Sequence, residues 1–170
     1  MKKLIFVLAV CSGLIAMWIA FSPQPRQLET SEEQPSLLKP GSYRVEFAEP
    51  DSRGWKAFFV MEVNTSGEIA EVNFDYLSVD GKLKTQDSEY NTRMKAVNGL
   101  GPGEYCPRFA KNLIVYQDPD QIDGITGATS SYHGFKMLAQ AAFAAARTGS
   151  QETVYISQPQ EANHGDGGGN

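Results

Sequence analysis

The sequence predicts an α+β domain with an antiparallel sheet covered by helices, preceded by an N-terminal transmembrane anchor. Three observations support this prediction. Several segments alternate apolar and polar residues as strands do, a later alanine-rich segment repeats apolar residues at helical spacing, and residues 4–21 carry no charge. The strands and helices fall within residues 40–157, which is enough chain for one domain with a core of its own.

Strand patterns open the domain. Residues 43–48 alternate between two faces, and residues 55–63 are rich in aromatic and β-branched side chains. A turn at residues 65–67 leads into a third expected strand over residues 68–77. After the long helix, residues 153–157 alternate again and are expected to close one edge of the sheet.

Three helices are expected among these strands. Polar residues from 87 to 98 suit a short helix that stops near Gly99, and residues 107–117 suit a second, with Pro107 in its first turn. The third helix is alanine-rich, contains no proline and ends at Gly149. Its apolar stripe consists of Phe135, Leu138, Ala139, Ala142, Phe143 and Ala146.

The stretch from residue 123 to 131 carries the clearest functional signal. Gly124 and Gly127 allow a positive φ and leave room for a ligand to approach the backbone. Thr129 and Ser130 place hydroxyls at the start of the third helix, where free N–H groups and the helix dipole favour phosphate. The stretch therefore predicts a phosphate site with a nucleophilic hydroxyl. Helix physics alone leaves another interpretation open, in which Thr129 or Ser130 is only an N-cap.

Residues 123–129 resemble the flavinylation motif of the FMN-binding domain family. That motif consists of Asp, two spacers, Ser or Thr, and then Gly-Ala-Thr, and this sequence shows no departure from it. The specified positions are filled by Asp123, Thr126, Gly127, Ala128 and Thr129.

The resemblance extends over about residues 40–157. One departure lies at the start, where Gly41 and Tyr43 keep the usual spacing but the acidic residue before them is missing. The other matching positions are Gly54–Trp55, Asn73–Tyr76, Asp80–Thr85, Tyr90–Asn91 and Phe135–Lys136.

The family includes a flavin-carrying component of the sodium-pumping NADH:quinone reductase and membrane-anchored flavoproteins of extracytoplasmic electron transfer. The resemblance implies FMN attached covalently to Thr129 through a phosphoester, transferred from FAD by a dedicated flavin transferase. It also implies a membrane electron donor and an extracytoplasmic acceptor. We expect a redox carrier without turnover of its own, because the sequence offers no catalytic set, cysteine metal cluster or dinucleotide fingerprint. Two alternatives are an FMN-dependent reductase of a small exported substrate and a non-redox exported binding module.

The sequence identifies the residues that would contact the flavin ring less clearly than it identifies the attachment motif. Trp55, Tyr76, Tyr90 and Tyr132 are candidates for an aromatic wall, with Tyr132 the favoured contact and Trp55 expected in the core. Asp123 is expected to stabilise the loop as a turn residue, with its carboxylate bonded to the backbone, and to be recognised by the transferase during attachment. Together with the motif glycines, Ala128 and Ser130, Tyr132 completes the expected cofactor site.

The N-terminus predicts export. Residues 1–21 begin with Lys2 and Lys3, and the 18 uncharged residues that follow span about 27 Å as a helix, close to a hydrocarbon core of about 30 Å. The lysines orient the N-terminus to the cytoplasm, so the domain is expected outside the cell membrane on a single span. An uncleaved anchor is favoured, with cleavage or lipidation at Cys11 as the alternative.

The composition limits which kinds of partner and metal site are expected for the exported part. Without Lys2 and Lys3, 13 basic residues face 20 acidic ones, so the exported part is a poor candidate for nucleic acid. Cys106 has no second cysteine there, so neither a disulfide nor a cysteine metal cluster is expected. Residues 22–39 read as a solvated tether, and residues 158–170 as a disordered tail.

Overall fold

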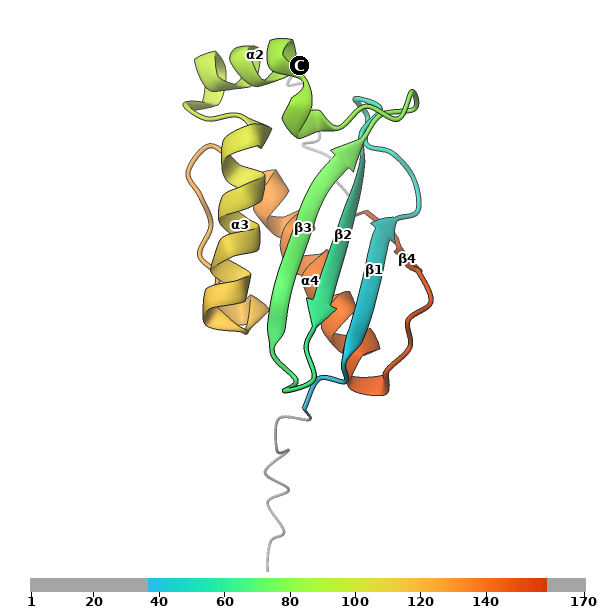
Figure 1. Cartoon of the computed structure of the whole chain (residues 1–170). Helices are drawn as coiled ribbons and strands as arrows, with labels where there is room; N and C mark the ends of the chain where they lie inside the picture. Colours follow the sequence, from blue (N-terminus) through green and yellow to red (C-terminus); the bar gives the residue numbers. More distant parts are fainter. Residues whose placement is uncertain (1–36, 159–170) are drawn as a thin grey trace, which may run out of the picture. The chain divides into compact units, whose positions relative to one another are not determined.

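The computed structural model describes residues 37–158 (Figure 1). The predicted anchor at residues 1–21, most of the predicted tether and all but the first residue of the predicted tail lie outside them. No helix within residues 37–158 is long and apolar enough to cross a membrane. The elements in chain order are β1 (Gly41–Phe47), β2 (Lys56–Val63), β3 (Ile69–Leu77), η2 (Lys84–Gln86), α2 (Ser88–Asn98), α3 (Pro102–Tyr116), η3 (Pro119–Gln121), α4 (Thr129–Thr148) and β4 (Val154–Ile156).

The sheet is mixed, which corrects the expected antiparallel sheet. Its order is β3-β2-β1-β4, with antiparallel pairs except at the edge, where β4 runs parallel to β1 and Val154 pairs with Val45. The reason is visible in Figure 1: α4 carries the chain back along the sheet before β4 begins. Lys39 N–H donates to Ala146 O (3.0 Å) where β1 is about to start, so β4 enters at the same end as β1.

The four expected strands are all present. The β2–β3 hairpin closes with Asn64 N–H donating to Glu68 O (2.9 Å), and Gly67 adopts φ 79° as the turn requires. The short β4 lies at the sheet edge, as its alternation after the long helix predicts. Alternation is enough to find these strands, although β1, β2 and β3 each contain three consecutive buried residues and β4 is only partly buried.

The helices are confirmed with one correction. α2 begins after Asp87, whose carboxylate accepts from Tyr90 N–H (2.9 Å), and ends at Gly99 in the left-handed region. The sequence predicts a start of the second helix at residue 107, but α3 begins at Pro102, and Pro107 lies inside it. The earlier start is stabilised by the Glu104 carboxylate, which accepts from Gly101 N–H (3.1 Å).

α3 and α4 cover one face of the sheet, with α3 against β3 and α4 against β1 and β2. Phe135 of α4 is fully buried and forms the centre of this core. Its ring stacks on Phe109 at 5.2 Å and meets Phe74 and Phe59 edge-on at 5.1 and 5.6 Å. This packing fixes α4 on the sheet and thereby fixes the position of its first turn.

Candidate functional site

The motif loop makes a tight turn into α4. Ala128 N–H donates to Ile125 O (2.9 Å), and Ala128 O accepts the first helical bond from Tyr132 N–H (2.8 Å). Gly127 has φ 85°, and a Cβ at this position would overlap Asn98 O and stand 2.7 Å from Leu100 Cδ2. Gly124 differs from the expectation, because its φ is not positive and a Cβ there would be 3.5 Å from the Tyr132 ring. Of these two motif glycines, only Gly127 is therefore required as glycine.

Thr129 is the first residue of α4 and is exposed to solvent. The N-cap is Ala128, and no side chain caps the helix, so neither Thr129 nor Ser130 serves as N-cap. The first turn contains no acidic residue. N–H groups before Tyr132 are therefore available to an anion in a region of positive helix potential.

A pocket of about 340 Å³ opens beside this helix start. Several parts of the fold converge there: the first turns of α4, the ends of β1, β2 and β3, the β1–β2 loop, and η2. Its volume lies within the range of about 300–1,000 Å³ that small-molecule sites occupy. The lining residues include Ser130, Ser131, His133, Phe47, Trp55 and Tyr76.

Two of the four candidate aromatics line this pocket. Trp55 and Tyr76 are each 8% exposed, and Trp55 meets Tyr90 edge-on at 5.6 Å in a second layer. Burial raises the pKa of the Tyr76 phenol well above its usual value, against a smaller opposing effect of the Ser131 hydroxyl. The Tyr76 phenol is thus a neutral donor at physiological pH.

The structure places other predicted residues outside this pocket. Tyr132 is half-buried and packs toward Phe109 at 6.0 Å, so it does not line the pocket, and its contact with the flavin ring stays a prediction. Gly124 and Thr126 line a more open surface depression of about 760 Å³ on the α3 side. Asp123 is exposed and lines neither space.

Sequence reasoning missed Lys84 as a site residue. This lysine is 4% exposed and lines the pocket from η2. A lysine that follows a Gly-containing turn normally points to solvent, so the residue type gives no warning. The available signal is that Lys84 lies in one of the runs that resemble the family, beside Thr85.

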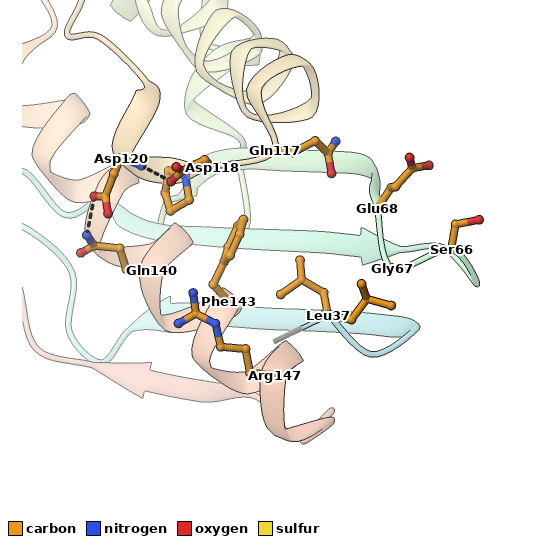
Figure 2. Close-up of a pocket in the computed structure, with 12 residues that line it drawn as sticks. Leu37, Ser66, Gly67, Glu68, Gln117, Asp118, Asp120, Gln140, Phe143 and Arg147 are labelled. Atoms are coloured by element: carbon orange, nitrogen blue, oxygen red, sulfur yellow. Dashed lines mark hydrogen bonds between the residues drawn. The ribbon is translucent and has the colours of Figure 1, made fainter. Parts of the chain in front are cut away.

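A second, larger hollow of about 870 Å³ lies near the other end of α4 (Figure 2). Phe143 and Arg147 line it, and Asp120 accepts from Gln140 Nε2 (3.1 Å) at its side. Twenty residues of helix span about 30 Å, so this hollow is remote from Thr129. The smaller pocket is instead lined by Ser130 and Ser131, which directly follow Thr129 in the first turn of α4, although Thr129 itself does not line it. That pocket is the candidate site because it is closest to the motif threonine and also has aromatic walls.

Comparison with known proteins decides the family. The model of the FMN-binding domain matches residues 54–144, more than half of the chain. The chain belongs to the FMN-binding domain family. This membership makes it a flavin-binding protein, and the matched region contains the pocket residues Trp55, Tyr76, Lys84 and Ser130 together with Thr129.

Two similar proteins illustrate the relationship. The 15 kDa lipoprotein of Treponema pallidum is 33% identical over 119 residues, which cover 70% of this chain and 84% of the lipoprotein. The crystal structure of a Clostridium perfringens protein is 38% identical, with a TM-score of 0.69 over 72% of this chain and 99% of that one. The fold described above is therefore shared with an experimentally determined structure.

The pocket fits a flavin mononucleotide. The helix start offers N–H groups to a phosphate, and the aromatic side chains of Trp55 and Tyr76 line the pocket. The polar groups Ser131 and Lys84 line the same pocket. Within residues 37–158, no group of three His, Cys, Asp or Glu side chains could hold a metal ion.

Proposed function

We propose that this protein is a membrane-tethered, extracytoplasmic electron-transfer flavoprotein whose FMN is attached to Thr129 by a phosphoester. The observation that carries the proposal is the place of Thr129. Its hydroxyl is on an exposed residue at the first position of α4, one residue before Ser130, which lines the flavin-sized pocket. The exposure of Thr129 gives an incoming transferase access to this residue, and the attached flavin would lie in the pocket that begins at Ser130.

The attachment reaction needs an accessible hydroxyl and a seat for phosphate. The P–O–P bond of FAD breaks, Thr129 Oγ1 bonds to the FMN phosphorus, and AMP leaves as the hydroxyl proton is released. The N–H groups of the first turn of α4 then stabilise the phosphodiester charge. The absence of an acidic residue in that turn favours the same outcome.

The flavin supplies the redox chemistry, and this chain binds and orients it. Trp55 and Tyr76, which line the pocket, would hold the ring, and the Tyr76 phenol and Ser131 hydroxyl would offer it hydrogen bonds. A covalent tie keeps the cofactor on a domain outside the cytoplasm, where a dissociable flavin would be lost by mass action. Electrons enter from a membrane donor and leave to an extracytoplasmic acceptor.

The membrane tether is supported by two observations. Residues 4–21 carry no charge after Lys2 and Lys3, and the Treponema pallidum relative is a lipoprotein by name. We propose a single membrane span at residues 1–21, with lipidation at Cys11 as the alternative. Incorporation of labelled fatty acid that is lost in Cys11→Ser would establish the alternative, and its absence from membrane-bound protein would support the span.

The experiment that tests the attachment site is intact mass measurement of the full chain co-produced with a flavin transferase. The wild type gains the mass of one FMN less one water. Thr129→Ala gains nothing, whereas the neighbouring Ser130→Ala still gains the flavin. Equal flavin mass on Thr129→Ala would overturn the assignment.

A further inference from the structure

Lys84 is a buried cation surrounded by aromatic rings. Its Nζ lies 4.1 Å from the Tyr76 ring centroid, 5.1 Å from that of Tyr90 and 5.5 Å from that of Trp55. Aromatic faces attract a cation and replace part of its lost hydration. Tyr76 and Trp55 are also pocket walls, so the ammonium and the pocket share their boundary.

The charge of Lys84 is not neutralised by a closely bonded carboxylate. Within residues 37–158, the one carboxylate oxygen within 4.0 Å is Asp51 Oδ2, at 3.9 Å, which is longer than a hydrogen bond. Asp75 is also buried, but its carboxylate accepts from Tyr76 N–H (2.7 Å) and from the backbone and hydroxyl of Thr85. The thiol of Cys106 stays neutral because burial raises its pKa.

The turn that carries Lys84 is held from two sides. Asp75 of β3 binds Thr85, as described above. Asn91 of α2 donates from Nδ2 to Lys84 O (3.0 Å) and Thr85 O (3.1 Å), and its Oδ1 accepts from Gly103 N–H (2.7 Å). Three of the sequence runs that resemble the family therefore converge to fix one lysine.

A buried ammonium that is not hydrogen-bonded to a carboxylate costs stability, and such groups concentrate at functional sites. The hydrogen bonds of Asp75 and Asn91 hold Lys84 in a defined position. It lines the same pocket as Ser130 and Ser131 of α4. We propose that Lys84 is the residue that tunes the redox potential of the flavin, by placing a buried positive charge beside the bound ring, with the carboxylate of Asp51, which lines the same pocket, 3.9 Å away. This inference rests on the proposed function and assigns the site an electrostatic role.

The chemistry follows from charge balance. Oxidation of an external donor delivers two electrons and one proton to the ring, which leaves one added negative charge in the pocket. The Lys84 ammonium attracts that charge in a partly desolvated site, where electrostatic interactions are stronger than in water. Lys84 therefore favours the reduced form and raises the midpoint potential. It has no role in attachment at Thr129.

The test is spectroscopic titration of the flavin-loaded full chain in detergent with dithionite and a reference dye. Lys84→Met removes the charge, and Lys84→Arg keeps it. The matched control is Lys82→Met, two residues away, since Lys82 is 55% exposed and pairs with Asp87 outside the pocket. We expect Lys84→Met to shift the reduction equilibrium at least tenfold toward the oxidised form, about 30 mV, with Lys84→Arg and Lys82→Met near wild type.

The outcomes separate this inference from the proposed function. A wild type without covalent flavin refutes the proposed function. A flavin-loaded Lys84→Met protein with unchanged potential refutes the tuning role, as does an equal shift in Lys82→Met. Loss of attachment in Lys84→Met would assign Lys84 to the phosphate instead. If both Lys84→Met and Lys84→Gln fail to fold, Lys84 is a structural residue and the inference is wrong.

Discussion

The carbonyl oxygen of Asn98, the last residue of α2, occupies the space that a side chain on Gly127 would need. Gly127 also has φ 85°, which other residues adopt at a cost. The motif glycine is thus explained by two independent constraints of this fold. Asn98 of α2 packs against the loop that precedes Thr129, so the position of the proposed attachment site depends on an element outside the motif.

Gly127→Ala is expected to destabilise the domain by about 1–3 kcal/mol through backbone strain, with a further loss from the overlap with Asn98. Flavin attachment should fall with it, because the loop can no longer close in front of α4. Urea denaturation and intact mass measure the two effects. Gly124→Ala is the control: its Cβ would make ordinary contact with Tyr132, so stability should change by less than about 1 kcal/mol.

Asn91→Ala is expected to destabilise the protein by about 1–3 kcal/mol, because carbonyls of η2 and Gly103 N–H lose their partner together. Urea denaturation provides the measurement. Asn73→Ala, on an exposed residue of β3, should stay within about 0.5 kcal/mol of wild type. An equal loss of unfolding free energy in both variants would show that the Asn91 hydrogen bonds do not stabilise the protein more than an exposed asparagine does.

The fold is largely predictable from periodicity, and its exceptions have physical causes. Alternation marks a strand but carries no information on direction, so the parallel pairing of β4 with β1 depends on the path of α4. The predicted start of α3 is too late because the sequence places Pro107 in the first turn, whereas the chain already turns into the helix at Gly101–Gly103. The Glu104 carboxylate caps that turn and converts it into a helix start.

The candidate site is predictable only where local sequence carries the chemistry. The motif places Thr129 at a helix start, and the structure agrees. The pocket walls depend on which strands and loops meet that helix, so the sequence favours Tyr132 although Trp55 and Tyr76 line the pocket. For Lys84 the sequence offers only its place in a run that resembles the family, since its burial results from three separate segments.

The pH dependence of stability tests the burial of Lys84. Burial lowers the pKa of its ammonium below the ordinary value of 10.5, with Asp51 opposing and smaller effects from Arg53 and Asp75. The unfolded chain then binds more protons between the folded and unfolded pKa values, so the free energy of unfolding rises with pH in that window. This contribution is complete above about 10.5 and is lost as pH falls through the folded pKa.

Lys84→Met removes this titration. The free energy of unfolding of wild type relative to Lys84→Met should therefore increase as pH rises toward 10.5, as measured by urea denaturation at several pH values. Near neutral pH the variant should be at least as stable as wild type, because it removes a buried charge. A lower stability of the variant at neutral pH, with no pH trend, would contradict the burial argument.

Cys106 should be inert in the native protein. It is 1% exposed in α3, and burial raises the pKa of its thiol, which removes the reactive thiolate. A thiol reagent such as DTNB should label it only after unfolding in urea. Rapid labelling of the folded protein would show that α3 opens readily or packs differently at this position.

The central claim is that the Thr129 hydroxyl carries the flavin. Its most direct test is peptide mapping of the flavinylated full chain by fragmentation mass spectrometry, which distinguishes Thr129 from Thr126, Ser130 and Ser131. We predict fragments that place one FMN phosphoester on Thr129 alone. Flavin on another of these residues, or flavin that dissociates completely when the protein is denatured, would contradict the account.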